Sequence, residues 1–245
     1  MSIAGYDPSA GAGVTADIKT FEQNGVYGLG VMTALTWQND IHFARVEWQP
    51  LQNIIDQVKL LLLRFPVSYV KIGLVENMTM LQQLIDFLHS LMPQPKIILD
   101  PILKASAGFV FHETEQEQFK ALMPGLFCIT PNIPEAELIF GCANLSGKLA
   151  ANSSNCAVYL KAGHATNGVV TDMLLHKESI KTFSNPRLPK GEKHGSGCVL
   201  SAALTAQLAL GHDLATAAGL ANKYTYRFLG SNETKLGYHA NISTS

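Results

Sequence analysis

The sequence predicts an α/β fold: a doubly wound, mostly parallel sheet with helices on both faces. Short apolar runs alternate with amphipathic helical segments over most of the chain, and this alternation is typical of parallel strands joined by helical crossovers. Residues 169–183 instead alternate around a polar turn, which indicates a small antiparallel hairpin. The 245 residues are 47% hydrophobic and show no repeat or linker. We therefore expect a single domain over residues 1–245 with one sizeable core.

The expected strands are the short apolar runs, which are residues 3–4, 28–36, 67–75, 96–100, 126–130 and 157–163. The expected helices have apolar residues at helical spacing, and they are residues 11–25, 51–63, 78–91, 114–123, 134–140, 197–211 and 214–229. The first helix carries Val14, Ile18 and Phe21 on one face and ends at Gly25. We expect residues 37–40, "WQND", to form a polar loop after the second strand.

Composition argues against several classes of function. The formal net charge is −1, so no overall basic field recruits nucleic acid or anionic lipid. The cysteines form no CxxC pair and no Cys/His ligand cluster, which suits a reducing compartment; they are Cys128, Cys142, Cys156 and Cys198. The chain opens on "SIAGYD" without a secretory-signal pattern, and its apolar stretches are short or amphipathic. We therefore expect a cytoplasmic protein with no membrane segment.

Polar residues follow the expected strands where they end. Carboxyl ends of parallel strands meet at one edge of a doubly wound sheet, where ligands collect, so these side chains should converge. They are Asp7, Gln38, Asn39, Gly73, Asp100, Thr130, Asn132, Glu135 and Lys161. Carboxylates, a lysine and a helix N-terminus are the groups that a Mg²⁺–phosphate site needs, because the metal takes oxygen ligands and the amides and lysine hold phosphate.

Several of these residues also have a structural explanation. Asp100 precedes a proline and could cap a turn. Glu135 could stabilise the first turn of its helix through the helix dipole, and Lys161 could be a solvated strand end. Gln38 could belong to an ordinary turn, although its amide both donates and accepts hydrogen bonds and therefore suits a flat heterocycle.

The first glycine-rich segment, residues 11–16, formally matches the dinucleotide pattern GxGxxA. That pattern requires its first glycine at the strand end, whereas several residues, including Asp7 and Pro8, intervene here. A segment that covers a substrate is the better interpretation. The sequence contains no Walker pattern GxxxxGK[ST].

The second glycine-rich segment, "HGSGC" at residues 194–198, runs directly into an apolar helix. The backbone amides of Gly195, Ser196 and Gly197 are therefore placed to hold an anion. A thiol, Cys198, stands at the junction.

Seven segments together resemble a known family. They are "SIAGYDPSAGAGVTADIKTF", "GVYGLGVMTALTWQN", "VKIGLV", "ILDPIL", "TPNIPEAELIFG", "LKAGH" and "HGSGCVLSAALTAQLALG". In this order they resemble the hydroxymethylpyrimidine/phosphomethylpyrimidine kinases of the ribokinase superfamily, over nearly the whole chain. The resemblance implies a three-layer ribokinase-like fold and ATP- and Mg²⁺-dependent phosphorylation of 4-amino-5-hydroxymethyl-2-methylpyrimidine and its monophosphate in thiamine biosynthesis. It also implies a homodimer.

The resemblance assigns roles to residues of this chain. Gly5, Asp7 and Gln38 fall where the family contacts the pyrimidine, and we place Gly73 with them as substrate-binding. Lys161, Asn132 and Thr130 are assigned to ATP, and Asp100 and Glu135 to Mg²⁺, directly or through water. Gly195, Ser196 and Gly197 would form the anion hole for the transferring phosphoryl group.

Cys198 occupies the position at which many superfamily members carry an aspartate base. A helix N-terminus lowers a thiol pKa, whereas phosphate bound at the same place opposes the thiolate. Cys198 therefore either accepts the proton of the substrate hydroxyl or simply fits a tight turn.

The chain departs from the family pattern at several places. Tyr6 replaces a small residue, Lys193 stands where threonine is common, and the segment between Cys142 and Cys156 is short and rich in Asn and Ser. The first expected strand is also short. A pyridoxal kinase of the same superfamily is therefore an alternative. A nicotinamide-dependent oxidoreductase and a non-catalytic heterocycle binder are alternatives of other classes.

Overall fold

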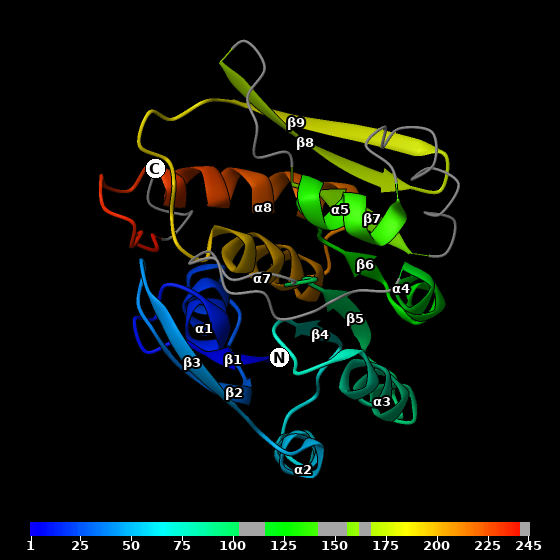
Figure 1. Ribbon diagram of the computed structural model, residues 1–245. Coiled ribbons are helices and arrows are strands. Elements are labelled where there is room, and N and C mark those ends of the chain that lie inside the picture. The colour runs from blue at the N-terminus through cyan, green and yellow to red at the C-terminus, as the bar shows by residue number, and fades with distance from the viewer. Residues whose placement is uncertain (103–115, 142–155, 162–167, 241–245) are drawn as a thin grey trace.

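The computed structural model describes residues 1–102, 116–141, 156–161 and 168–240. A nine-stranded sheet with the order β3-β2-β1-β4-β5-β6-β7-β8-β9 forms the middle layer (Figure 1). Its strands are β1 (Ser2–Tyr6), β2 (Gly30–Gln38), β3 (Phe43–Trp48), β4 (Tyr69–Ile72), β5 (Lys96–Leu99), β6 (Cys128–Ile129), β7 (Ala157–Leu160), β8 (Val169–His176) and β9 (Ser179–Pro186). The expected fold class, a doubly wound and mostly parallel sheet, is confirmed.

The centre of the sheet is parallel. β1 pairs with β2 on one side and with β4 on the other, and β4, β5, β6 and β7 continue in parallel from there. The chain therefore reverses its direction of winding between β1 and β4. In such sheets ligands bind outside the carboxyl ends of the strands, at this switch point.

Antiparallel strands extend the sheet at both edges. The expected hairpin is β8 and β9, which pairs with β7. A second hairpin, β2 with β3, was not predicted, and the expectation of a loop from residue 37 is wrong, because Trp37 and Gln38 end β2. Pairing with β3 keeps Trp37 and Gln38 in a strand, and the Arg45 guanidinium lies 3.7 Å from the centre of the Trp37 ring.

Helices cover both faces of the sheet (Figure 1). On one face, apolar side chains of α2 (Leu51–Leu62), α3 (Met78–His89), α4 (Gln116–Leu122) and α5 (Ile133–Phe140) share a core with the strands. On the other lie α1 (Gly13–Gln23), α7 (Ser196–Ala209) and α8 (Leu214–Leu229). Helix α7 is buried from Cys198 to Leu208, as expected for a helix that is apolar on all sides. Within the described residues, no helix combines the length and apolar character needed to cross a bilayer.

The start of α1 depends on a glycine. Gly13 has a φ of +64°, and a Cβ there would lie 2.1 Å from the carbonyl oxygen of Gly5. A side chain is therefore excluded on both conformational and steric grounds. This close approach brings the loop of residues 7–12 down onto the end of β1.

Candidate active site

A cavity of about 300 Å³ opens at the carboxyl edge of the sheet, around the switch point. It is lined by the ends of parallel strands, the loop before α1 and the first turn of α7. The lining residues are Gly5, Ala12, Gly13, Thr36, Gln38, Leu74, Asp100, Ile102, Asn132, Glu135, Lys161, His194, Gly195, Ser196, Gly197 and Cys198. We call this the acceptor cavity. It brings together ten of the residues that the sequence analysis assigned to the site. The strand-end argument predicted this for five of them, Gln38, Asp100, Asn132, Glu135 and Lys161.

Three of the assigned residues, Asp7, Gly73 and Thr130, do not line this cavity. Asp7 and Thr130 are buried behind its wall. Thr130 donates a hydrogen bond from Oγ1 to Oδ1 of Asp100 at 3.1 Å. Gly73 leaves room for its neighbours, because a Cβ there would lie 3.0 Å from the Cβ of Ala4 and 3.2 Å from Nζ of Lys71. In this structure all three support the site from behind.

The Asp7 carboxylate organises the loop that covers the acceptor cavity. Its oxygens accept hydrogen bonds from the backbone N of Ser9 and of Ala12, each at 2.9 Å, and from Oγ of Ser9. Nε2 of His194 lies 2.8 Å from Oδ2 of Asp7, whereas Nδ1 of His194 is buried with no hydrogen-bond partner among the described residues. Burial opposes the charge on Asp7, but the bonds from His194 and Ser9 outweigh it and lower the pKa of Asp7.

Asp100 is the centre of a charged cluster at the floor of the cavity. Its Oδ1 lies 2.7 Å from Nζ of Lys161, and its Oδ2 accepts a hydrogen bond from Oγ of Ser201 at 3.1 Å. Burial raises the pKa of a carboxyl group, but Lys161 and Lys71 hold the pKa of Asp100 below its ordinary value. Asp100 is therefore an anion at neutral pH, with a cation beside it.

Glu135 and Asn132 form a capping box at the start of α5. Oδ1 of Asn132 accepts from the backbone N of Glu135 at 2.9 Å, and Oε2 of Glu135 accepts from the backbone N of Asn132 at 2.8 Å. Glu135 therefore has a structural role in capping α5, and it also lines the acceptor cavity. Burial raises the pKa of Glu135 to about 7, against the opposing effect of Lys161. Its carboxyl group can therefore gain or lose a proton near neutral pH.

The glycine turn of residues 194–198 leads into α7, and we call it the anion-binding turn after the role that the sequence predicts for its amides. Gly195 is the N-cap of α7 with a φ of +74°, and a Cβ there would lie 2.0 Å from the carbonyl oxygen of Gly11. The turn is therefore packed directly against the loop over the cavity. Nζ of Lys161 lies 3.1 Å from the position that a Cβ of Gly197 would occupy, so a lysine and the helix N-terminus face the same space.

Cys198 lies buried in the first turn of α7. Burial raises the pKa of its thiol to about 11, although Lys71 acts in the opposite direction. The helix N-terminus therefore does not make this thiol a ready thiolate in the free protein.

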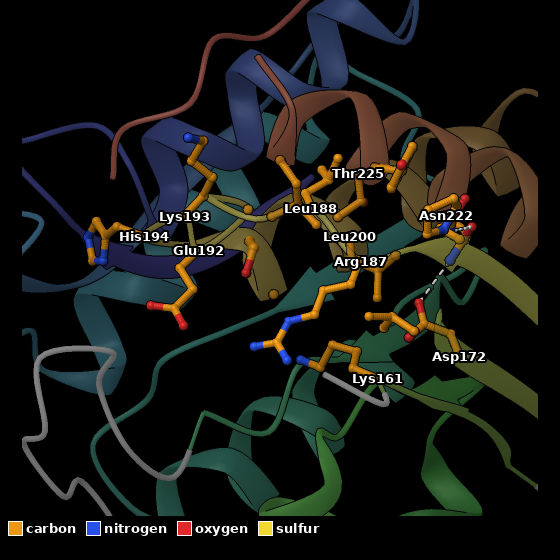
Figure 2. A pocket seen from close by; sticks show the side chains of 18 of the residues that line it. Lys161, Asp172, Arg187, Leu188, Glu192, Lys193, His194, Leu200, Asn222 and Thr225 are labelled. Carbon is orange, nitrogen blue, oxygen red and sulfur yellow. Dashed lines mark hydrogen bonds between the residues drawn. The ribbon is translucent and has the colours of Figure 1, made fainter. Parts of the chain in front are cut away.

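A second cavity of about 430 Å³ adjoins the first (Figure 2). Its walls come from β8, β9, the loop before α7 and one face of α8, and Lys161 and Arg187 extend into it (Figure 2). Four residues line both cavities, and they are Lys161, His194, Ser196 and Gly197. We call the second cavity the donor cavity.

The sequence analysis missed most of the donor cavity, including Asp172, Arg187, Asn222 and Lys235. These residues lie far apart in the chain, and no local pattern joins them. The one available signal was the Pro- and Gly-rich stretch at residues 186–197, which ends in the anion-binding turn.

Two adjoining cavities that meet at a lysine and a helix N-terminus can hold a phosphoryl donor on one side and a small acceptor on the other. Phosphoryl transfer needs this positioning and charge stabilisation more than covalent help from the protein. The fold and the site therefore define a small-molecule kinase with a ribokinase-like fold.

The chain belongs to the phosphomethylpyrimidine kinase family, whose model matches residues 7–243. It is 33% identical over 240 residues to a hydroxymethylpyrimidine/phosphomethylpyrimidine kinase from Staphylococcus aureus strain MRSA252, with 91% of this chain and 85% of the relative covered. It is 32% identical over 253 residues to the kinase of the same name from Aquifex aeolicus strain VF5, with 97% and 96% covered. The protein is thus an ATP-dependent kinase, and the oxidoreductase and non-catalytic alternatives lose their support.

Solved structures agree with this assignment. A phosphomethylpyrimidine kinase from Clostridium difficile 630 matches with a TM-score of 0.74 and 32% identity, covering 91% of this chain and 96% of that one. The pyridoxal kinase from Staphylococcus aureus in complex with AMP-PCP matches with a TM-score of 0.84 and 22% identity, covering 99% and 93%. At that identity the second match shows the shared fold only.

Proposed function

We propose that the protein phosphorylates 4-amino-5-hydroxymethyl-2-methylpyrimidine and then its monophosphate, as a kinase of thiamine biosynthesis. The observation that carries this proposal is the convergence of Gln38, Lys161 and the anion-binding turn on one cavity, in a chain of the phosphomethylpyrimidine kinase family. The amide of Gln38 can donate to a ring nitrogen and accept from an exocyclic amine. The single domain expected over residues 1–245 would carry the whole site.

In this proposal each cavity takes one substrate. The pyrimidine would lie in the acceptor cavity with its hydroxymethyl group toward Cys198, and ATP would lie in the donor cavity with its γ-phosphate at the shared wall. Lys161 and the amides of Gly195, Ser196 and Gly197 would stabilise the charge on the transferring group. Asn132 would contact phosphate oxygens from the start of α5, whereas Thr130 would act through Asp100.

Asp100 and Glu135 fit the protein side of a Mg²⁺–phosphate site. The described residues contain no group of three His, Cys, Asp or Glu side chains able to hold a metal alone. This suits Mg²⁺, which is usually held by one or two carboxylates, water and the phosphates of its substrate. When bound, Mg²⁺ would neutralise phosphate charge, and Glu135, with a pKa raised to about 7, would ionise to receive it.

Cys198 would take the proton in the transfer step. The hydroxymethyl oxygen bonds to the γ-phosphorus of ATP while the bond from that phosphorus to the β,γ-bridging oxygen breaks and ADP leaves. The hydroxyl proton passes to the thiolate form of Cys198, which becomes a thiol and later returns the proton to water.

Pyridoxal kinase activity is the second candidate function. Pyridoxal is also a flat ring with a hydroxymethyl arm, and Tyr6, which follows the cavity residue Gly5 at the end of β1, stands where the family pattern has a small residue. Homodimer formation and a cytoplasmic location also remain proposals, and sedimentation velocity tests the first.

An ADP-release assay with four acceptors side by side tests the proposed function. We expect turnover with the pyrimidine alcohol and with its monophosphate, weak turnover with pyridoxal and none with ribose. Preference for pyridoxal would move the assignment to the second candidate. No ADP release with any acceptor would overturn the kinase assignment itself.

A further inference from the structure

A completely enclosed ion pair lies behind the acceptor cavity and lines neither cavity. Nζ of Lys71 on β4 lies 2.7 Å from Oδ2 and 2.9 Å from Oδ1 of Asp17 on α1, and both side chains are 0% exposed. Oγ of Ser2 donates to Oδ2 of Asp17 at 2.5 Å. The pair therefore reaches neither solvent nor the cavity walls.

A buried ion pair usually stabilises a fold no more than well-packed apolar residues at the same positions would. Removing two charges from water costs free energy that their attraction only partly offsets, so well-packed apolar replacements are often neutral or stabilising. The pair is better explained by what its charges do to their neighbours.

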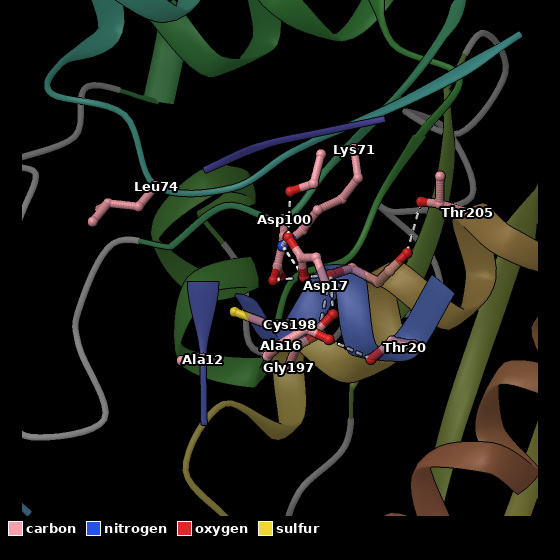
Figure 3. Close-up of polar contacts among 12 residues, drawn as sticks. Ala12, Ala16, Asp17, Thr20, Lys71, Leu74, Asp100, Gly197, Cys198 and Thr205 are labelled. Carbon is pink, nitrogen blue, oxygen red and sulfur yellow. Dashed lines mark hydrogen bonds and ion pairs between the residues drawn. The ribbon is translucent and has the colours of Figure 1, made fainter. Parts of the chain in front are cut away.

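Lys71 lies near two residues of the proposed site, Asp100 and Cys198 (Figure 3). Its Nζ lies 3.2 Å from the position of a Cβ on Gly73, at the carboxyl end of β4. Figure 3 shows Lys71, Asp17, Asp100 and Cys198 gathered between the strand ends and the first turns of α1 and α7. Burial opposes a charge on Lys71, but Asp17, Cys198 and Asp100 together raise its pKa. Lys71 is therefore a permanent cation.

Four charged residues on different elements interact electrostatically with the Cys198 thiol. Lys71 on β4 lowers the pKa of the thiol, whereas Asp100 after β5 and Asp17 on α1 raise it. Lys161 after β7 is the fourth, and its own pKa is raised in part by Cys198. Of the two members of the enclosed pair, the lysine favours the thiolate and the aspartate opposes it.

We propose that Lys71 is the fixed positive charge that stabilises the thiolate of Cys198, and that Asp17 holds Lys71 in place and limits its effect. Both are positioning residues, because they act through Cys198. The inference rests on the proposed role of Cys198 as proton acceptor. In that step the thiolate gains the hydroxyl proton, so a larger thiolate population gives faster transfer.

The test measures the thiol itself, without ATP or acceptor. Iodoacetamide alkylation of Cys198 is followed by peptide mass spectrometry between pH 7 and pH 10 in the wild type, Lys71→Gln and Asp17→Asn. A shift of one unit in thiol pKa changes the rate below that pKa roughly tenfold. We expect the rate at pH 8.5 to fall roughly tenfold in Lys71→Gln and to rise roughly tenfold in Asp17→Asn.

The alkylation rate of Cys198 is expected to fall in one variant and rise in the other, and this distinguishes an electrostatic role from a merely structural one. Loosening of the fold would expose buried thiols and raise alkylation in both variants, at Cys128 as well as Cys198. Cys128 is buried in β6 and serves as the internal control. An increase at Cys198 in both variants, or no change in either, would overturn the proposal.

A double variant covers the case in which Lys71→Gln fails to fold because Asp17 is left unpaired. Lys71→Met with Asp17→Leu removes both charges together. Because Lys71 affects the thiol more strongly than Asp17 does, we expect alkylation of Cys198 to fall and kcat to fall with it, while KM for ATP stays unchanged. An unchanged pH profile of alkylation would overturn the proposal. If the pH profile of alkylation shifts but no acceptor is phosphorylated, the effect of Lys71 on the Cys198 thiol is supported and the proposed function is wrong.

Discussion

Nε2 of His194 lies 2.8 Å from Oδ2 of Asp7, although 187 residues separate the two in the chain. Asp7 holds the loop that covers the acceptor cavity, and His194 begins the anion-binding turn. The backbone N of His194 also donates to the carbonyl oxygen of Lys235 at 2.8 Å. One buried carboxylate thus fixes the acceptor side of the site relative to the phosphate side, and a C-terminal segment holds the same turn.

Replacing Asp7 with Asn tests this connection. The variant keeps the size of the side chain but loses the charge that receives hydrogen bonds from Ser9, Ala12 and His194. The amide oxygen of Asn still accepts part of this set, and leaving one buried donor poorly satisfied costs about 1–3 kcal/mol. We expect the free energy of unfolding, measured in urea at pH 7, to fall by roughly 1–3 kcal/mol, with KM for the acceptor raised. Ser9→Ala removes only one hydroxyl and should cost less.

The same pair predicts a pH dependence with a definite sign. The pKa of Asp7 is lowered below its ordinary value of 3.8, so its ionised form stabilises the folded state. That contribution is complete above the unfolded pKa and is lost as the pH falls through the lower, folded pKa. The stability difference between wild type and Asp7→Asn should therefore narrow as the pH falls below about 4. A difference that stays constant from pH 7 to pH 3 would contradict this explanation.

The sequence could predict those parts of the site whose position follows from a pattern of neighbouring residues. Strand ends in a parallel sheet share one edge, which placed Asp100, Glu135 and Lys161 together. The glycine turn before an apolar helix predicted free backbone amides at the start of α7. The segment "TPNIPEAE" contained the capping residues of α5.

The parts that sequence could not predict depend on distant partners. The contact between Asp7 and His194 joins two segments far apart in the chain, and no local pattern in the sequence announces it. The strand β3 has intermediate or exposed side chains along its length, so only pairing with β2 identifies it. The donor cavity draws Arg187 and Asn222 from separate elements with no spacing rule between them.

Gln38 provides the sharpest test of the acceptor. Replacement with Leu keeps the approximate size but removes both the donor and the acceptor groups of the amide. A site built to pair with ring nitrogens then loses roughly 1.4–2.8 kcal/mol, so we expect KM for the pyrimidine alcohol to rise roughly 10- to 100-fold while KM for ATP is unchanged. Gln52→Leu, the same change at an exposed position of α2, is the control. Equal effects on both substrates would place Gln38 outside the pyrimidine subsite.

Glu135 predicts a link between pH and Mg²⁺. Its pKa is raised to about 7 from an ordinary 4.5, so the folded state favours the protonated form. Its contribution to stability is complete below the unfolded pKa and is lost as the pH rises through about 7. Relative to Glu135→Gln, the metal-free wild type should therefore lose roughly 2–3 kcal/mol between pH 4 and pH 8.

Mg²⁺ should reverse that loss, because it favours the ionised carboxylate. In Glu135→Gln we expect the Mg²⁺ concentration for half-maximal activity to rise roughly tenfold or more. Glu137→Gln, an exposed residue on the same helix, should leave it unchanged. Calorimetry of MgADP binding in two buffers should show proton release by the wild type at pH 6.5 and none by Glu135→Gln. Equal release by both proteins would remove Glu135 from the metal site.

The Cys198→Ala variant tests whether the thiol accepts the hydroxyl proton or only fills space in the turn. Burial raises its pKa to about 11, so the thiolate fraction grows roughly tenfold for each unit of pH below that value. If thiolate accepts the hydroxyl proton, kcat/KM should rise steeply between pH 7 and pH 9 in the wild type. In Cys198→Ala it should be flat and roughly 10²-fold lower or more. Cys128→Ala removes a buried thiol away from the site and should keep the wild-type profile. A Cys198→Ala enzyme within threefold of the wild type, with the same rise, would leave the amides of Gly195, Ser196 and Gly197 as the catalytic contribution of this turn.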